Sequence, residues 1–399
     1  MKAKCGALPQ FLVNGPESSS YYLRLMSIPK RNFRVFATCN IGDDALNLLR
    51  ERGYELEVYD SLEAPPKSLI LEKVSSGIDG LITTLRDPID AEVFEAGRGT
   101  LKVVAQDAVG FDNINRADAN RYKVPFTHTA DVLNEATAEF AFLILGSVAR
   151  KLGPAEHLVR DNRWGTWHPY LPFLGDEVTG KTISVIGTGR IGQALIKKGI
   201  GFDSNFLCFD AFPPPPDFLN KIQEMMDLRF RQGFTPQRRT IRCVGFEEAL
   251  AGGDFVTLHV PLLREGEAAM PTYHLINEKT LRMMKPTAYL VNTSRGPVVD
   301  ERALAAAIKA RAIAGAALDV YETEPLPPDS PLRAPEIEDR VRLFPHFASA
   351  GRTTRLSTDP NKGMAGRCVQ ALIDVLESNY EGNPANMPYV VNKEAFRQR

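Results

Sequence analysis

Residues 181–192 read Lys181-Thr182-Ile183-Ser184-Val185-Ile186-Gly187-Thr188-Gly189-Arg190-Ile191-Gly192, and the helix-forming segment Gln193-Ala194-Leu195-Ile196 follows. A short apolar, β-branched run thus enters a Gly-x-Gly-x-x-Gly turn that leads into a helix, which is the order of a phosphate-binding strand-turn-helix. Gly187 allows the tight turn, Gly189 lets a pyrophosphate approach the backbone, and Gly192 lets the helix pack closely on its strand. The free N–H groups and the positive dipole end of the helix then face the phosphates.

The strand expected at residues 206–209 ends in Asp210, which lies 18 residues after Gly192. An acidic residue about 20 residues beyond the last glycine meets the ribose hydroxyls of a dinucleotide. A carboxylate there repels the 2′-phosphate of NADP, and the next residues, Ala211 and Phe212, supply no cation to offset it. The turn therefore predicts a dinucleotide site that prefers NAD(H).

An arginine-rich segment follows at residues 213–242, and it begins with the prolines of 213–216. It contains a predicted helix at 217–230 and five arginines, which are Arg229, Arg231, Arg238, Arg239 and Arg242. We interpret it as a surface insertion with a solvated basic face. The alternative is a clamp for the extra phosphate of NADP, which keeps NADP possible as the cofactor.

The composition excludes some classes of partner. The 399-residue chain is 44% hydrophobic and 24% charged, as in an ordinary soluble globular protein that is long enough for two domains. Its formal net charge is −1, so no global field attracts nucleic acid or an anionic membrane. No apolar run reaches the roughly 18 residues of a membrane span. The expected partners are small molecules and further copies of this chain.

The cysteines are scattered along the chain without any Cys-x-x-Cys spacing, at Cys5, Cys39, Cys208, Cys243 and Cys368. An odd number without a pairing pattern argues against a disulfide framework and against a zinc site, so we expect no metal and a reducing, cytoplasmic location. Residues 1–32 lack the apolar core of a secretory signal and are expected to form a flexible N-terminal extension.

Strand and helix patterns alternate on both sides of the glycine turn. Before it, strands are expected at 34–38, 55–59, 80–84 and 101–105, with helices at 43–52, 69–74 and 89–96; after it, further strands are expected at 255–260, 288–292, 314–320 and 341–344. Alternation at this pitch predicts parallel sheets covered by helices on both faces. A one-sided helix expected at 361–379 should return to pack on the first unit.

Between the two units, residues 134–145 are apolar on nearly all sides, which predicts a helix that is buried all round between domains or between subunits. The segment 161–177 has no regular period and is expected to be an irregular arm. It carries the two tryptophans of the chain, Trp164 and Trp167, which we interpret as packing anchors rather than catalytic groups.

Three polar residues stand where late strands are expected to end, and they are Arg295, Glu324 and His346. Reduction with a nicotinamide cofactor needs a cation to polarise the substrate carbonyl and hold a carboxylate, and a proton donor for the alkoxide being formed. The fixed fork of an arginine suits the first task, and a histidine suits the second. Glu324 would keep His346 oriented and favour its charged form. Taken singly, the three residues also fit an ion pair, a turn and a core side chain; together on a nucleotide-binding sheet they favour catalysis.

Five long motifs resemble those of the D-isomer-specific 2-hydroxyacid dehydrogenases, and the resemblance spans residues 33–392. They are Ala108-Val109-Gly110-Phe111-Asp112-Asn113-Ile114, Gly187-Thr188-Gly189-Arg190-Ile191-Gly192, Val291-Asn292-Thr293-Ser294-Arg295-Gly296, Ala317-Leu318-Asp319-Val320-Tyr321-Glu322-Thr323-Glu324-Pro325 and Pro345-His346-Phe347-Ala348-Ser349-Ala350. The spacings of 29 residues from Arg295 to Glu324 and 22 residues from there to His346 are those of the family's catalytic set.

The resemblance implies an α/β fold with two Rossmann-like parallel-sheet domains and a cleft between them. A flavodoxin-like substrate domain comprises residues 33–130 and 352–399, and an NAD-binding domain comprises residues 131–351. A homodimer built through residues 134–145 and the tryptophan-bearing arm is the family expectation.

The resemblance also implies a role for each site residue. His346 is the acid and base, Glu324 is its partner, and Arg295 anchors the substrate. The backbone N–H groups of Val109 and Gly110 help to bind the substrate carboxylate, and Leu85 and Arg86 lie in a loop that closes over it. The expected cofactor-binding residues are Thr137, Gly187, Gly189, Arg190, Ile191, Gly192, Asp210, Val260, Pro261, Thr293, Asp319, His346 and Ala348.

Within the family, residues 131–139 and Trp167-His168-Pro169 look most like those of glyoxylate and hydroxypyruvate reductases. The chain is therefore expected to reduce a small 2-oxo acid to a D-2-hydroxy acid. One alternative is a 3-phosphoglycerate dehydrogenase, which would need extra basic groups for the substrate phosphate. Another is a nucleotide-sensing binding protein similar to the C-terminal-binding co-repressors. The segment 213–242 and the N-terminal extension depart from the family pattern.

Overall fold

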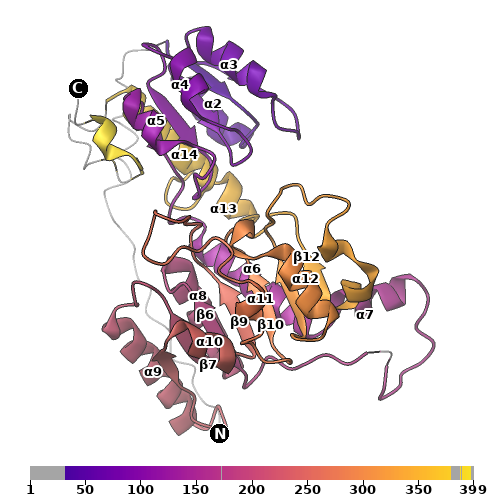
Figure 1. Cartoon of the computed structure of the whole chain (residues 1–399). Helices are drawn as coiled ribbons and strands as arrows, with labels where there is room; N and C mark the ends of the chain where they lie inside the picture. The colour runs from indigo at the N-terminus through magenta and orange to yellow at the C-terminus, as the bar shows by residue number, and fades with distance from the viewer. Residues whose placement is uncertain (1–31, 172, 379–386, 388, 397–399) are drawn as a thin grey trace, which may run out of the picture.

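The computed structural model describes residues 32–171, 173–378, 387 and 389–396. Two parallel sheets form the centres of two domains, which lie one above the other in Figure 1 with α13 (Arg352–Leu356) at their junction. This two-domain α/β arrangement confirms the predicted fold class. The extension predicted for residues 1–32 lies outside the described residues, apart from its last residue.

The first sheet has the strand order β2-β1-β3-β4-β5. Its strands are β1 (Arg34–Ala37), β2 (Glu55–Val58), β3 (Gly80–Thr83), β4 (Val103–Gln106) and β5 (Phe126–Thr127). The helices that connect them are α2 (Asp43–Glu51), α3 (Lys67–Ser75), α4 (Ala91–Ala96) and α5 (Arg116–Arg121). All four strand pairs are parallel, and this order is that of the flavodoxin-like sheets.

Both faces of the first sheet are covered, because successive side chains of a strand point to opposite sides. On β1, Val35 packs in a core with α2 and α14 (Met364–Leu376), whereas Phe36 packs in a second core with α3, α4 and α5. The C-terminal helix α14 thus returns to the first domain, as predicted.

The second sheet has the strand order β12-β11-β10-β9-β6-β7-β8. Its strands are β6 (Thr182–Ile186), β7 (Asn205–Phe209), β8 (Ile241–Cys243), β9 (Phe255–Leu258), β10 (Tyr289–Asn292), β11 (Gly315–Leu318) and β12 (Val341–Leu343). Its helices include α6 (Asn134–Ala149), α8 (Arg190–Gly199), α9 (Pro216–Arg231), α10 (Phe246–Gly252), α11 (Glu278–Leu281) and α12 (Glu301–Lys309). The order reverses between β6 and β9, as in dinucleotide-binding sheets, and ligands bind at this switch point.

Side-chain caps decide where several helices begin. The carboxylate of Asp90 accepts a hydrogen bond from the N–H of Glu92, so α4 begins at Ala91, two residues later than the apolar pattern predicts. In the second domain, Asp300 accepts from the N–H of Ala303 and starts α12 in the same way.

Residues 213–242, expected as a surface insertion, also carry part of the second domain's core. Helix α9 buries Ile222 and Met226, which lie four residues apart on one face, and β8 pairs in parallel with β7. Strands β5 and β8 were not predicted, since runs of two and three residues are too short to show a period.

Two apolar segments that were expected to be covered are partly exposed in a single chain. Helix α6 is not buried all round, because Leu143 is 60% exposed. The described residues of the segment 161–177 form no helix or strand, as predicted, but Trp164 and Trp167 are 53% and 75% exposed. In both places an apolar surface is left open on the second domain.

None of the helices in the described part of the chain is both long and apolar enough to cross a membrane. The described cysteines, Cys39, Cys208, Cys243 and Cys368, are free thiols.

Candidate active site

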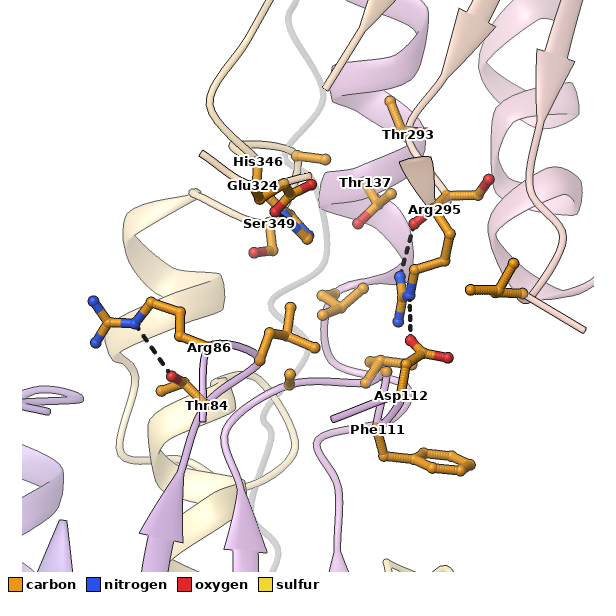
Figure 2. A pocket seen from close by; sticks show the side chains of 18 of the residues that line it. Thr84, Arg86, Phe111, Asp112, Thr137, Thr293, Arg295, Glu324, His346 and Ser349 are labelled. Carbon is orange, nitrogen blue, oxygen red and sulfur yellow. Dashed lines mark hydrogen bonds and ion pairs between the residues drawn. The ribbon is translucent and has the colours of Figure 1, made fainter. Parts of the chain in front are cut away.

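A cleft of about 1850 Å³ lies between the two domains, and residues of both line it. Figure 2 shows its centre, where Arg295, Glu324 and His346 project from the second domain and Asp112 and Arg86 from the first. The cleft adjoins the carboxyl ends of the strands, where open α/β sheets bind their ligands.

The glycine turn between β6 and α8 fits a pyrophosphate. Gly187 has a φ of +94°, and a Cβ there would lie 2.5 Å from the carbonyl oxygen of His259. A Cβ at Gly192 would lie 2.1 Å from the carbonyl oxygen of Gly187, whereas the space beside Gly189 is open. Gly189 precedes α8 without a side-chain cap, so the first N–H groups of that helix are available to phosphate oxygens. The geometry at each glycine is compatible with the task predicted for it.

Asp210 lies at the end of β7 against this turn. Its Oδ2 accepts a hydrogen bond of 2.6 Å from the N–H of Thr188, and its Oδ1 accepts one of 2.8 Å from the N–H of Phe212. The carboxyl group of Asp210 therefore lies beside the glycine turn.

Four of the five arginines that were considered for an NADP clamp have partners elsewhere. Arg229 pairs with Asp203 at 2.9 Å, Arg238 with Asp227 at 2.8 Å and Arg242 with Glu248 at 2.9 Å, while Arg239 donates to the carbonyl oxygen of Gly180. The hydrogen bond from Arg238 lowers the pKa of Asp227 to about 2. A phosphate would have to compete with these partners.

His346 and Glu324 form a pair at the edge of the cleft. The Nδ1 of His346 lies 2.8 Å from Oε2 of Glu324, and Oε1 of that carboxylate accepts from the N–H of Tyr321 at 3.0 Å. With Nδ1 bound, the ring presents Nε2, which has no hydrogen-bond partner in the described part of the chain. His346 also has a left-handed φ of +53°, a conformation that non-glycine residues seldom adopt and that is common at functional sites.

Asp319 holds the loop that carries His346. Its carboxylate accepts hydrogen bonds from the N–H groups of Phe347 and Ala348 at 2.7 and 2.8 Å, and its carbonyl oxygen accepts from the N–H of His346 at 2.9 Å. Asp319 is fully buried and does not line the cleft, so its contribution to a cofactor site is indirect.

Burial and charged neighbours shift the pKa of Glu324 and of two further histidines of the cleft, His128 and His259. Partial burial acts to raise the pKa of Glu324, but the hydrogen bond and charge of His346, the N–H of Tyr321 and the charge of Arg295 together lower it. Glu324 is therefore a carboxylate near neutral pH. Burial lowers the pKa of His128 and takes that of His259 to about 3, so neither supplies an imidazolium proton at pH 7.

Arg295 reaches across the cleft to the first domain. Its Nε donates to Oδ2 of Asp112 at 2.6 Å, and one terminal nitrogen donates to the carbonyl oxygen of Ser294 at 2.7 Å (Figure 2). A Cβ on Gly110 would lie 1.3 Å from the other terminal nitrogen, so the guanidinium rests directly on the backbone of Gly110. The structure thus brings Arg295 onto the loop that was expected to bind the substrate carboxylate.

Arg86 is placed differently from Arg295. It donates to the carbonyl oxygen of Leu62 at 2.6 Å and lies 3.4 Å from Oγ1 of Thr84. In Figure 2 its guanidinium points away from Arg295 and His346. Its side chain lines the cleft but does not converge on the histidine.

The other predicted site residues fall into two groups. Those that line the cleft are Leu85, Val109, Gly110, Thr137, Ile191, Val260, Pro261, Thr293 and Ala348. Those that lie along or beside the glycine turn are Gly187, Gly189, Arg190, Gly192 and Asp210, and Arg190 is paired there with Asp131.

The sequence reasoning missed several polar residues of the cleft, namely Asp107, Asp112, His128, Ser349 and Arg355. Asp107 and Asp112 flank the Val109-Gly110 loop, and this position in the sequence could have indicated that they lie in the cleft. Nothing in the sequence indicated which of the two would pair with Arg295.

Comparison with known proteins gives the same picture. The family profile described as "D-isomer specific 2-hydroxyacid dehydrogenase, NAD binding domain" matches residues 142–348. The chain is 42% identical to the glyoxylate reductase of Korarchaeum cryptofilum over 81% of its own length and 88% of the relative's. It is 37% identical to that of Thermococcus litoralis over 88% and 96%. The crystal structure of the TT0316 protein from Thermus thermophilus superposes with a TM-score of 0.74 at 36% identity, covering 90% of this chain and all of that one.

Proposed function

This chain belongs to the D-isomer specific 2-hydroxyacid dehydrogenase family, and from that premise we propose that it reduces glyoxylate and hydroxypyruvate with NADH, giving the D-2-hydroxy acid where the new centre is chiral. It is an NAD-dependent oxidoreductase. The observation that carries the choice of substrate is the similarity, at 36 to 42% identity over most of the chain, to proteins named glyoxylate reductase.

In the proposed reaction, bound NADH supplies the hydride that the carbonyl carbon accepts. Arg295 and the N–H groups of Val109 and Gly110 hold the substrate carboxylate; the proposal is supported by the contact of the guanidinium with the backbone of Gly110 and by the place of all three residues in the cleft lining. His346 donates its Nε2 proton to the carbonyl oxygen as that oxygen gains negative charge. Glu324, at 2.8 Å from Nδ1, fixes the ring and stabilises the positive charge that the ring carries before the transfer.

The same geometry supports a proposal for the cofactor site. The turn at Gly187, Gly189 and Gly192 would hold the pyrophosphate, and Asp210 the adenosine ribose. We propose NADH as the preferred form, since the Asp210 side chain lies beside the turn and four of the five arginines of residues 213–242 have other partners.

We also propose the oligomeric state, the cellular location and the domain boundaries of the protein. A homodimer is supported by the exposed apolar side chains of Leu143, Trp164 and Trp167, which a second copy would cover. A cytoplasmic location is supported by the free thiols of the described cysteines. The domain boundaries, with residues 33–130 and 352–399 in one domain and 131–351 in the other, are supported by the two separate sheets.

The test is oxidation of NADH in the presence of glyoxylate, hydroxypyruvate, pyruvate and 3-phosphohydroxypyruvate. We expect turnover with glyoxylate, and a higher kcat/KM with NADH than with NADPH. Tight NADH binding without turnover of any 2-oxo acid would favour the nucleotide-sensing alternative, and the greatest kcat/KM with the phosphorylated acid would favour the 3-phosphoglycerate dehydrogenase alternative.

A further inference from the structure

Asp107 is a carboxylate in the active-site cleft that has no partner. It lies at the end of β4, where its N–H donates to the carbonyl oxygen of Thr83 at 2.8 Å. Its side chain makes no hydrogen bond or ion pair with any residue of the described chain. The Oδ1 atom is covered and unsatisfied, while the residue as a whole is partly accessible and lines the cleft. Oδ2 is therefore the oxygen that a ligand can reach.

The surroundings of Asp107 do not compensate its charge. The charged and titratable groups that act on it are Arg355, Cys39 and Cys368, and burial raises its pKa to about 7 in spite of the arginine. Arg355 is already committed, because it donates to the carbonyl oxygen of His346 at 3.1 Å. An unpaired, partly buried carboxylate lowers the stability of the folded protein. A group that destabilises the fold and lines a cleft is a candidate for binding a ligand.

The position of Asp107 relates it to the substrate. Ala108 alone separates it from Val109 and Gly110, which carry the N–H groups for the substrate carboxylate. On the other side it is within electrostatic reach of Arg355, whose guanidinium touches the His346 loop. A short acid that places its carboxylate on the loop and its carbonyl at His346 therefore has its remaining substituent available to this region of the cleft.

We propose that Asp107 is a specificity residue, which accepts a hydrogen bond from a donor on the third carbon of the 2-oxo acid. A hydroxyl group suits it best, because a hydroxyl can donate to the carboxylate and can also accept from the protonated acid. A methyl group leaves the carboxylate unsatisfied, and a phosphate or second carboxylate is repelled by it. Hydroxypyruvate is thus favoured over pyruvate and over 3-phosphohydroxypyruvate at this position.

This inference rests on the proposed reductase function and deepens it. The test compares kcat/KM for hydroxypyruvate and pyruvate in the wild type, Asp107→Ala and Asp107→Asn, all with NADH. We expect the wild-type ratio of hydroxypyruvate to pyruvate to fall about tenfold or more in Asp107→Ala, since loss of a hydrogen bond to a charged group has at least this effect. Asp107→Asn keeps a carbonyl acceptor in the same place, so its ratio should lie between the other two.

Two controls separate the possible failures. Asp44→Ala removes an exposed aspartate of the same domain and should keep the wild-type ratio. As a readout without turnover, D-glycerate should raise the unfolding temperature of the wild type more than D-lactate does, and this difference should vanish in Asp107→Ala.

The outcomes are distinguishable from those for the proposed function. Absence of glyoxylate turnover by the wild type would overturn the reductase proposal. Normal glyoxylate turnover, with a hydroxypyruvate to pyruvate ratio that is the same in the wild type and Asp107→Ala, would overturn only the role of Asp107. Faster wild-type reduction of 3-phosphohydroxypyruvate than of hydroxypyruvate would also overturn it.

Discussion

Each wall of the cleft carries one carboxylate of particular interest, and the two differ in what surrounds them. On the wall of the second domain, Glu324 is bound by His346 and by the N–H of Tyr321, and its pKa is lowered. On the wall of the first domain, the side chain of Asp107 has no hydrogen-bond or ion-pair partner among the described residues, and burial raises its pKa to about 7. At pH 7 the same chemical group is thus ionised on one side of the cleft and only about half ionised on the other. Glu324, which has a protein partner, is proposed to orient the proton donor. Asp107, which has none among the described residues, is proposed to contact the substituent that differs between substrates.

The largest effect is expected where the fixed pair is broken. His346→Ala removes the proposed proton donor and should lower kcat about 10²- to 10⁴-fold, because general acid catalysis contributes factors of this size. NADH binding, measured by fluorescence titration, should stay near the wild-type value, since the glycine turn is untouched. Glu324→Gln keeps the shape of the partner but not its charge, and it should give a smaller loss of kcat. If the His346→Ala enzyme kept nearly the wild-type kcat at pH 7, the proposal that His346 is the general acid would be wrong.

A second, smaller effect is expected at the point where the two walls touch. Gly110→Ala places a methyl group where a terminal nitrogen of Arg295 now lies, at 1.3 Å, so the guanidinium must move. We expect kcat/KM for glyoxylate to fall about 10- to 100-fold, which corresponds to roughly 1.4 to 2.7 kcal/mol. Most of the change should appear in KM, because Arg295 is proposed to hold the substrate carboxylate.

The matched control is Gly146→Ala in α6, where an added Cβ meets nothing within 4 Å in the described chain apart from its chain neighbours and the backbone of its own helix. It should leave kcat/KM at the wild-type value. Asp112→Ala provides a further comparison, since it frees Nε of Arg295 without adding a steric clash and should raise KM by about fivefold, as for a partly exposed ion pair. If Gly110→Ala were no worse than Gly146→Ala, the approach of Arg295 to this loop would be irrelevant to binding.

The two walls also differ in how far the sequence predicts them. The glycine turn, Asp210 and the order of the strands follow from local patterns, in which residues a few positions apart report on one element. Glu324 and His346 are separated by only one strand and its loops, so their meeting follows once the strands are placed. The ion pair of Arg295 with Asp112 joins residues 183 positions apart in different domains, and no local pattern encodes it.

Other features escaped prediction for related physical reasons. Whether Asp107 has a hydrogen-bond partner depends on which side chains the tertiary structure brings near it. A local sequence motif carries no information about this. Strand β8 is defined by its pairing with β7 and not by its own three residues. The exposure of Trp164 and Trp167 depends on surfaces outside a single chain, so their apolar character predicted burial that the isolated subunit does not supply.

The smallest effect is expected in the pH dependence of the protein's folding stability, through the titration of Asp107. The pKa of Asp107 is about 7 in the folded protein and near 3.9 when the chain is unfolded, so between these values the folded state binds more protons. Stability therefore decreases as the pH rises through this window, and the loss is complete above pH 7. The ideal loss between pH 5 and pH 8 is about 2.7 kcal/mol, and partial access of water to the group reduces it to about 1–2 kcal/mol.

Asp107→Asn abolishes this titration while keeping the side-chain shape. The variant's free energy of unfolding, measured in urea, is compared with that of the wild type at each pH. The difference in favour of the variant should be about 1–2 kcal/mol larger at pH 8 than at pH 5. The exposed Asp44→Asn variant should show no such pH-dependent difference. A gain that is equal at both pH values would mean that Asp107 is ionised in the folded protein throughout, and then the contrast with Glu324 would lie in their hydrogen-bond partners and not in their charge.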